Sequence, residues 1–240
     1  MKIRVVTAFP DMITPYFSES MFKKAREMDL VEFEVWDLRD FTRDKHRQID
    51  DKPYGGGAGM VLKPEPFFRA HDKIVEIDGK SEKPTIILPT PQGKKLEHDL
   101  SVKLAEFNAI TFFCGHYKGI DERVRENLVT HEISIGDYVL TGGELPALVI
   151  IDSLIRHIPE VLHNYESARS DSFTDHLLEG PIYTKPREYR GHKVPDILLS
   201  GHHAKIKAWK KKKRISRTRQ RREELLNNKS ENHLVEDKNG

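Results

Sequence analysis

A ligand-binding loop is the first candidate site in this sequence, in the stretch Ser134-Ile135-Gly136-Asp137-Tyr138-Val139-Leu140-Thr141-Gly142-Gly143-Glu144-Leu145-Pro146. Its apolar residues lead to Gly142 and Gly143, and glycine permits both a positive φ and the close approach of a ligand to the backbone. Leu145-Pro146 then begins a helix, because proline fits a first turn whose N–H groups lack partners. The stretch predicts a pocket of exposed amides at a loop-to-helix junction. An ordinary turn after a buried strand is the alternative, since short glycine motifs often occur by chance.

Two charged residues interrupt the next helix, which we predict over residues 144–158 and which is apolar almost all round. Such a helix is buried or covered by a second subunit. Asp152 and Arg156 are four residues apart on one face, so an ion pair between them would explain both. Alternatively, the guanidinium of Arg156 is aimed at a substrate. A charge on so apolar a helix requires a partner in either case.

A polar segment rich in Ser, Glu, Asp and His follows over residues 160–180. We predict that it is an interdomain linker, mobile when no substrate is bound. Asp171 or Ser172 could cap a short helix through Leu178, because both residue types accept hydrogen bonds at helix N-termini. The residues alone assign no other role to this segment.

Alternating strands and helices must position these candidates. Apolar runs predict strands at residues 2–9, 31–36, 85–88, 109–114 and 132–135. Helical spacing predicts helices from Ser20 and Ile120 and over residues 64–75, 96–107 and 144–158, with a turn or loop over residues 77–83. This order favours an α/β fold with a mainly parallel sheet.

Three of these strands end in loops that contain glycine or proline, at residues 89–93, 115–119 and 135–143. In open α/β sheets, ligands bind outside the carboxyl ends of the strands. None of the loops has the glycine spacing of a dinucleotide-binding fold or of a P-loop. The expected pocket therefore suits a compact cofactor that is bound largely by backbone groups.

A second glycine-rich segment, Pro53-Tyr54-Gly55-Gly56-Gly57-Ala58-Gly59-Met60, follows a polar loop over residues 39–52. Four glycines in five positions cost backbone entropy that a simple connector need not incur. Successive free amides there could form an anion-binding nest. A flexible loop is the alternative, but Tyr54 and Met60 at its ends predict that the segment is packed.

Composition limits the class of protein. The chain has 240 residues and one cysteine, Cys114, which excludes a disulfide framework and a cysteine-based zinc site. We expect no signal peptide and no membrane span, and hence a cytoplasmic location. The net charge is only +2, yet the twenty residues from His203 to Arg222 hold eleven Lys and Arg and no acid. Such asymmetry indicates a polyanionic partner, although most charge runs are only solvated helix faces.

The basic residues belong to a separate module that begins at Pro181. We predict one helix with Ile206 and Trp209 facing inward, and a second basic helix from Arg214 to Arg222 that ends at Leu225-Leu226. Residues 227–240 are polar, and we predict that they are disordered.

The sequence as a whole resembles the bacterial tRNA (guanine-N1)-methyltransferases, the TrmD type within the SPOUT class. The similarity runs in order from residue 1 to about residue 226. It is carried by Arg39-Asp40-Phe41-Thr42, Asp50–Met60, Pro91-Gln92-Gly93, Gly119-Ile120-Asp121-Glu122-Arg123-Val124, Ser134–Pro146, Asp171-Ser172-Phe173 and Leu198-Leu199-Ser200-Gly201.

The resemblance implies a fold and a domain order. It implies a SPOUT-type parallel sheet with a deep trefoil knot in an S-adenosylmethionine-binding domain over residues 1–159. The linker and a small, mainly helical, basic tRNA-binding domain over residues 181–226 follow. The knot comes from the resemblance alone, because chains rarely thread their own loops. It also implies an obligate homodimer with its active sites at the subunit interface.

The implied reaction is methyl transfer from S-adenosylmethionine to N1 of the guanosine immediately 3′ of the anticodon, tRNA position 37. By resemblance, Asp171 is the general base and Arg156 the catalytic arginine. N1 of guanine carries a proton at neutral pH, which a carboxylate can accept, and a guanidinium can stabilise the charge that spreads to O6. The residues expected to bind the cofactor are Pro89, Thr90, Pro91, Gly115, Ile135, Gly136, Asp137, Tyr138, Val139, Leu140, Gly142, Gly143 and Pro146.

Two positions depart from the family pattern. Lys118 stands where many relatives have glutamate, which puts an acidic role there in doubt, including any part in binding magnesium, a candidate second cofactor. Ala58 replaces the usual proline of the glycine-rich loop. Two other functions compete with the implied one: a non-enzymatic RNA-binding module with the same fold, and a SPOUT enzyme that acts on rRNA.

Overall fold

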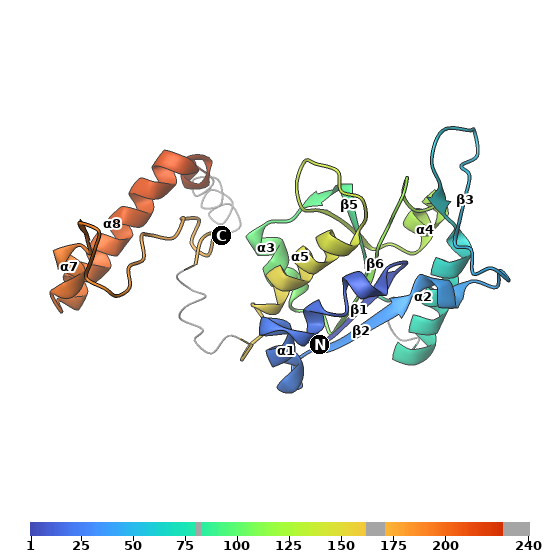
Figure 1. Cartoon of the computed structure of the whole chain (residues 1–240), viewed down its shortest axis with the longest axis horizontal. Helices are drawn as coiled ribbons and strands as arrows, with labels where there is room; N and C mark the ends of the chain where they lie inside the picture. The colour runs from blue at the N-terminus through green and yellow to red at the C-terminus, as the bar shows by residue number, and fades with distance from the viewer. Residues whose placement is uncertain (80–82, 162–170, 228–240) are drawn as a thin grey trace, which may run out of the picture. The chain divides into compact units, whose positions relative to one another are not determined.

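The computed structural model describes residues 1–79, 83–161 and 171–227 (Figure 1). The chain divides into two compact units, Met1–His163 and Asn164–Gly240. The predicted linker is therefore described only at its two ends, and the predicted tail only at Asn227.

A five-stranded parallel sheet forms the centre of the first unit. Its strands are β1 (Lys2–Thr7), β2 (Glu32–Asp37), β5 (Ile86–Lys95), β6 (Ala109–Phe113) and β7 (His131–Ser134). Their order is β2-β1-β6-β5-β7, and each neighbouring pair is parallel. The α/β class with a parallel sheet is confirmed. Strands β6, β5 and β7, in or after which the three ligand loops were predicted, are neighbours in the sheet.

Five helices cover the two faces of this sheet, because its strands are apolar on both sides. Helices α1 (Ser20–Glu27), α3 (His98–Leu104) and α5 (Glu144–Ile155) cover one face. The strand residues Ile3, Val5 and Phe112 belong to the hydrophobic core on this face. Helices α2 (Pro64–Asp78) and α4 (Glu122–Asn127) pack on the other face, with Val6 and Phe113 (Figure 1). The alternation along β1 and β6 matches the two-residue period of a strand.

Short 3₁₀ segments and one hairpin complete the first unit. The 3₁₀ segments are η1 (Pro10–Met12), η2 (Tyr16–Ser18) and η3 (Leu38–Phe41). Strands β3 (Asp50–Asp51) and β4 (Val61–Leu62) form an antiparallel pair that closes the glycine-rich segment at its base.

Several predicted boundaries were wrong. Strand β5 continues past Leu88 to Lys95, and its pairing with β7 shifts register between Pro89 and Lys94, which both lie opposite Ile133. The expected loop at residues 89–93 is thus a bulge within a strand. Helix α2 extends to Asp78 and ends at Gly79, whose φ is +89°.

Helix α1 begins at Ser20, as predicted. Its N-cap is Glu19, which is extended and makes no side-chain cap hydrogen bond. Helix α5 ends at Ile155, three residues earlier than predicted, and Arg156 is its C-cap.

Within residues 171–227, the second unit contains a short hairpin, the helices α7 (Asp196–Leu199) and α8 (His203–Arg221), and helical residues at 224–227. Strands β8 (Glu188–Tyr189) and β9 (His192–Lys193) are antiparallel, and helices α7 and α8 follow. A single basic helix over His203–Arg221 replaces the two that we predicted.

Helix α8 is held by residues 173–179. The Oγ1 atom of buried Thr218 accepts a hydrogen bond from Leu178 N at 2.9 Å, and Arg214 Nη1 donates to Asp175 Oδ2 at 2.9 Å. Arg217 Nη1 donates to the carbonyl of Glu179 at 3.0 Å. Arg214 and Arg217 therefore stabilise the packing of α8 against these residues.

Candidate functional site

The loops that follow β6 and β7 are joined by their backbones. Gly143 N donates to Gly115 O at 2.7 Å, and His116 and Gly142 form an antiparallel bridge. The structure therefore brings together the predicted cofactor residues of these two loops. At the far end of the second loop, Lys95 of β5 lies 3.4 Å from the carboxylate of Asp137.

The remaining predicted cofactor residues lie on the same elements. Pro89 is buried in β5, and in the bulge that follows Thr90 is half-buried and Pro91 is exposed. Pro146 is buried in the first turn of α5. The loop between Ile135 and Gly142 is open to solvent, with exposed residues at Asp137, Tyr138, Val139, Leu140 and Thr141.

Close packing, rather than positive φ, explains the glycine pair. Gly143 has a φ of −83°, and a Cβ added to it would lie 3.0 Å from Cys114 Cα and from Gly115 N. A Cβ on Gly142 would lie 2.3 Å from Glu144 Oε2 and 2.5 Å from His116 Nδ1. The atoms that approach these two glycines here belong to the protein itself, and the close approach of a ligand stays a prediction.

A third glycine, Gly136, adopts the positive φ that we expected of the pair. Its φ is +151°, and the ring of Tyr138 occupies the space that its Cβ would need. The Ser134 hydroxyl accepts from Gly136 N at 3.2 Å and donates to Gly136 O at 3.0 Å. These contacts make a compact turn directly after β7.

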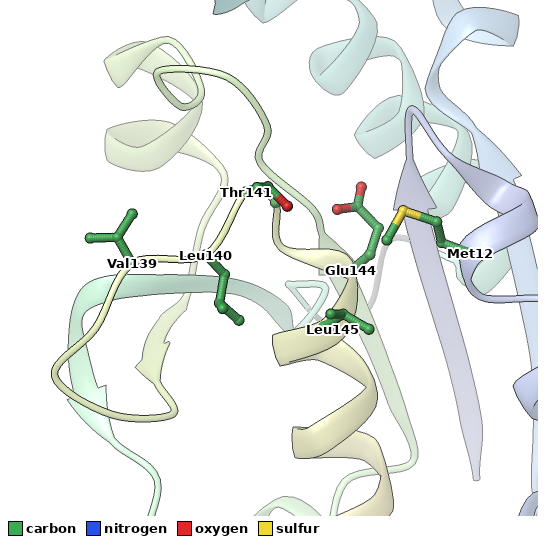
Figure 2. Close-up of a pocket in the computed structure, with 7 residues that line it drawn as sticks. Met12, Val139, Leu140, Thr141, Glu144 and Leu145 are labelled. Carbon is green, nitrogen blue, oxygen red and sulfur yellow. The ribbon is translucent and has the colours of Figure 1, made fainter.

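A cavity of about 340 Å³ lies where this loop meets α5 (Figure 2). Its wall is mainly apolar, and its lining residues are Met12, Val139, Leu140, Thr141, Gly142, Glu144 and Leu145. Val139, Leu140 and Gly142 were predicted from the sequence. Met12 comes from η1, after the distant strand β1, and its thioether points toward Glu144 (Figure 2). Nothing in the spacing of the sequence indicates that Met12 lies at this cavity. Glu144 could have been predicted to lie there, because a charged residue at the start of an apolar helix is unusual.

Glu144 is the most deeply buried charged residue of this region, with 1% of its surface exposed. Thr7 Oγ1, at the end of β1, donates to Glu144 Oε1 at 2.6 Å. The other carboxylate oxygen, Oε2, lies 3.8 Å from His116 Nδ1, and neither atom has a hydrogen-bond partner in the described part of the chain. His116 also stacks near Phe9, with 4.4 Å between the ring centroids.

The glycine-rich segment is not packed as predicted. Gly55, Gly56, Gly57 and Gly59 all have positive φ, the side chain of Tyr54 is fully exposed, and a Cβ on any of the first three glycines would meet nothing within 4 Å. The segment extends beyond the short β3–β4 pair (Figure 1). Gly56 N donates to Pro53 O at 3.4 Å, and the anion-nest hypothesis stays a prediction.

The loop after β6 is also anchored to this hairpin. Lys118 N donates to Met60 O at 3.0 Å, and Leu62 N donates to Gly119 O at 3.0 Å. The side chain of Lys118 lies against Gly59, so close that a Cβ there would be 2.9 Å from Lys118 Cγ. The residue that departs from the family pattern therefore contacts the glycine-rich segment.

The two predicted catalytic residues lie in different units. Arg156 is exposed at the C-terminal end of α5, and Asp171 is half-buried in the second unit. The helix that Asp171 or Ser172 might have capped is absent from residues 171–179, which form turns. There, Ser172 Oγ accepts from Glu179 N at 2.9 Å and closes the turn.

Neither a metal cluster nor a membrane span emerges from the described ranges. They contain no group of three or more His, Cys, Asp or Glu side chains that could hold a metal ion. No helix among them is long and apolar enough to cross a bilayer. The magnesium hypothesis thus has no candidate ligand set in this part of the chain.

Comparison with known proteins identifies the family. A sequence model described as tRNA (Guanine-1)-methyltransferase TrmD matches residues 1–228. The tRNA (guanine-N(1)-)-methyltransferase of Brevibacillus brevis is 54% identical over 226 residues, which cover 94% of this chain and 91% of the relative. An enzyme of the same name from Shouchella clausii is 53% identical over 94% of this chain and 91% of the relative. Another, from Bacillus cereus, is 51% identical over 94% of this chain and 92% of the relative. The chain therefore belongs to the TrmD family of tRNA (guanine-N1)-methyltransferases.

Proposed function

We propose that this protein transfers a methyl group from S-adenosylmethionine to N1 of the guanosine at tRNA position 37, in the cytoplasm. The observation that carries the proposal is the bonded pair of loops after β6 and β7, joined from Gly143 to Gly115, beside the 340 Å³ cavity. Family membership supports the reaction, and the predicted cofactor residues Val139, Leu140 and Gly142 line the cavity.

The residues present fit such a cofactor. The cavity wall combines apolar side chains, backbone amides and one buried carboxylate oxygen without a hydrogen-bond partner in the described residues. A Cβ at Gly142 would fill the space beside that oxygen. When bound, S-adenosylmethionine supplies a methyl group that its sulfonium already activates.

Within this proposal, the protein's own side chains manage the proton and the charge. Asp171 accepts the N1 proton of the target guanine, and the guanidinium of Arg156 stabilises the negative charge on O6. Both assignments rest on the family resemblance. Arg156 is an exposed residue at the C-terminal end of α5.

A homodimer is part of the proposal. On α5, Leu145 and Val149 are 45% and 46% exposed, and they share one face with the exposed Asp152 and Arg156. An apolar face on an otherwise buried helix is stabilised when a second copy covers it. The same dimer would place Arg156 at the subunit interface. The deep trefoil knot remains the family expectation for this unit.

The tRNA is proposed to bind through the outward side of α8. Lys210, Lys211, Lys212 and Lys213 are exposed, whereas Arg214 and Arg217 are engaged by residues 175–179. The target base must leave its stack to expose N1, and single-stranded loop bases are the usual sequence-specific targets in RNA.

The test is methyl transfer from labelled S-adenosylmethionine to two unmodified tRNA transcripts. One carries guanosine immediately 3′ of the anticodon and the other carries adenosine there. We expect transfer to the first alone, with the product mapped to N1 of guanosine 37. Tight tRNA binding without transfer to either transcript would instead indicate a binding module, and transfer to rRNA alone would indicate a different substrate.

A further inference from the structure

A buried carboxyl group forms part of the wall of the proposed cofactor cavity. Glu144 lines the cavity, yet its side chain is 1% exposed and its Oε2 has no hydrogen-bond partner in the described residues. Burying a carboxylate is unfavourable unless hydrogen bonds or opposite charges compensate for the lost hydration. A glutamate that only capped the helix would not need to face an apolar cavity.

Three features of the fold surround this carboxyl group. Thr7 donates to Oε1 at 2.6 Å, and the imidazole of His116 faces Oε2 at 3.8 Å. Glu144 is also the first residue of α5, a helix of 12 residues, whose N-terminus stabilises negative charge. The pKa of the buried Cys114 thiol is raised well above its usual range, first by burial and then by the charge of Glu144.

We infer that Glu144 makes the cavity selective for a cationic ligand, and thus for the sulfonium cofactor over its neutral thioether product. This inference rests on the proposed function. S-adenosylmethionine and S-adenosylhomocysteine differ by one methyl group and by the positive charge on sulfur. A buried carboxylate acts on that charge across a region of low dielectric constant, where water and salt screen it weakly.

The charge of the ligand changes in the reaction itself. Transfer breaks the S–CH₃ bond and leaves its electron pair on sulfur, while the methyl carbon bonds to N1 of guanine. The N1 proton passes to the carboxylate of Asp171, the proposed general base. The sulfur becomes neutral, so the attraction to Glu144 ends when the methyl group has moved. The carboxylate therefore retains the substrate form of the cofactor and favours release of the product form.

The experiment measures binding by isothermal titration calorimetry with the full-length protein and three ligands. They are S-adenosylmethionine, S-adenosylhomocysteine and sinefungin, an unreactive analogue that carries an amine near the sulfonium position. For Glu144→Gln, we expect the dissociation constants of the two cationic ligands to rise about tenfold and that of the neutral product to change less than about twofold. The variant keeps an acceptor for Thr7 and nearly the same volume.

Thr7→Val is the matched control. It removes the hydrogen bond to Oε1 but keeps the negative charge, so it should change the affinities for all three ligands by similar factors. Equal losses for cationic and neutral ligands in Glu144→Gln would overturn the inference and leave Glu144 with a positioning role only. Wild-type protein that bound none of the three ligands would contradict the proposed function itself.

A second variant is needed if circular dichroism shows that Glu144→Gln is unfolded. Glu144→Asp keeps the charge but draws it back by one methylene group. We expect its ratio of cofactor to product affinity to fall about threefold, because the charge is then farther from the cavity. An unchanged ratio would contradict the inference.

Discussion

The backbone amide of Gly143 donates to the carbonyl of Gly115 across 2.7 Å, and this bond joins the loop after β7 to the loop after β6. It also fixes the start of α5, because Gly143 is the N-cap of that helix. The approach is possible only without a side chain, since a Cβ on Gly143 would lie 3.0 Å from two backbone atoms.

Gly143→Ala should therefore disturb the proposed cofactor site. The clash is with backbone, which cannot rotate away, so we expect a loss of about 1–3 kcal/mol in the free energy of unfolding. Affinity for S-adenosylmethionine should fall by at least about tenfold. Calorimetry and urea unfolding measure the two effects. Gly180→Ala is the control and should change neither quantity, because its added Cβ would make only ordinary contact, 3.4 Å from Arg214 Cγ.

Asp171→Ala tests the proposed general base. Without the carboxylate, single-turnover methyl transfer should slow by at least about 10²-fold, while the affinity for tRNA in a filter-binding assay stays close to that of wild type. Asp196→Ala, which removes an exposed carboxylate from the same unit, should leave transfer unchanged. Weaker tRNA binding with normal turnover of the bound substrate would remove Asp171 from the chemistry.

Replacing Lys210–Lys213 with glutamine tests the outward side of α8. The change should weaken tRNA binding and lower the slope of log affinity against log salt by about 2 to 3, because each lost phosphate contact removes nearly one released counterion. Glutamine at Lys23 and Lys73, which pair with Glu27 and Glu76 of their own helices, is the control. An unchanged slope would exclude this helix from the interface with RNA.

Val149→Glu tests the proposed dimer. A glutamate on the exposed apolar face of α5 would be buried without a partner in a dimer, so we expect a monomer by size exclusion with light scattering. Ile77→Glu is a matched control, because Ile77 is similarly exposed, at 48%, but lies on α2. A wild-type monomer, or a Val149→Glu dimer of undiminished stability, would contradict this assembly.

A buried ion pair couples the stability of the first unit to pH. Arg4 is 1% exposed, and its Nη2 donates to Asp78 Oδ1 at 2.7 Å, which joins β1 to the end of α2. The hydrogen bond from Arg4 holds the pKa of Asp78 below its usual range. Since the folded-state pKa is the lower one, this stabilisation is present above the unfolded-state pKa of about 3.9 and is lost as pH falls through the folded-state pKa.

Asp78→Asn should lower the free energy of unfolding by about 3 kcal/mol at neutral pH, because it leaves a buried guanidinium with fewer partners. The difference from wild type should shrink below about pH 4, where Asp78 of the unfolded wild-type chain takes up a proton that the folded state does not yet bind. Urea unfolding at several pH values measures both. Asp72→Asn, on the same helix but with an 80% exposed side chain, should have little effect. A constant difference across this pH range would assign the loss to packing.

Much of the architecture follows from local patterns in the sequence. Apolar runs predicted the strands, helical spacing predicted the helices, and their alternation predicted a parallel sheet, because these signals depend only on residues a few positions apart. The glycine-bearing motifs predicted the loops after β6 and β7, and the specific motifs Pro53–Met60 and Ser134–Pro146 were enough to indicate the family.

The tertiary structure decided how these parts meet. It carried β5 through the bulge opposite Ile133, left Tyr54 exposed, and merged two predicted helices into α8 with Arg214 turned toward Asp175. It also set Thr7 against Glu144, 137 residues away, in the wall of the cavity. Local periodicity shows which face of an element is apolar, whereas a contact between distant residues exists only after the sheet has fixed which strand ends are neighbours.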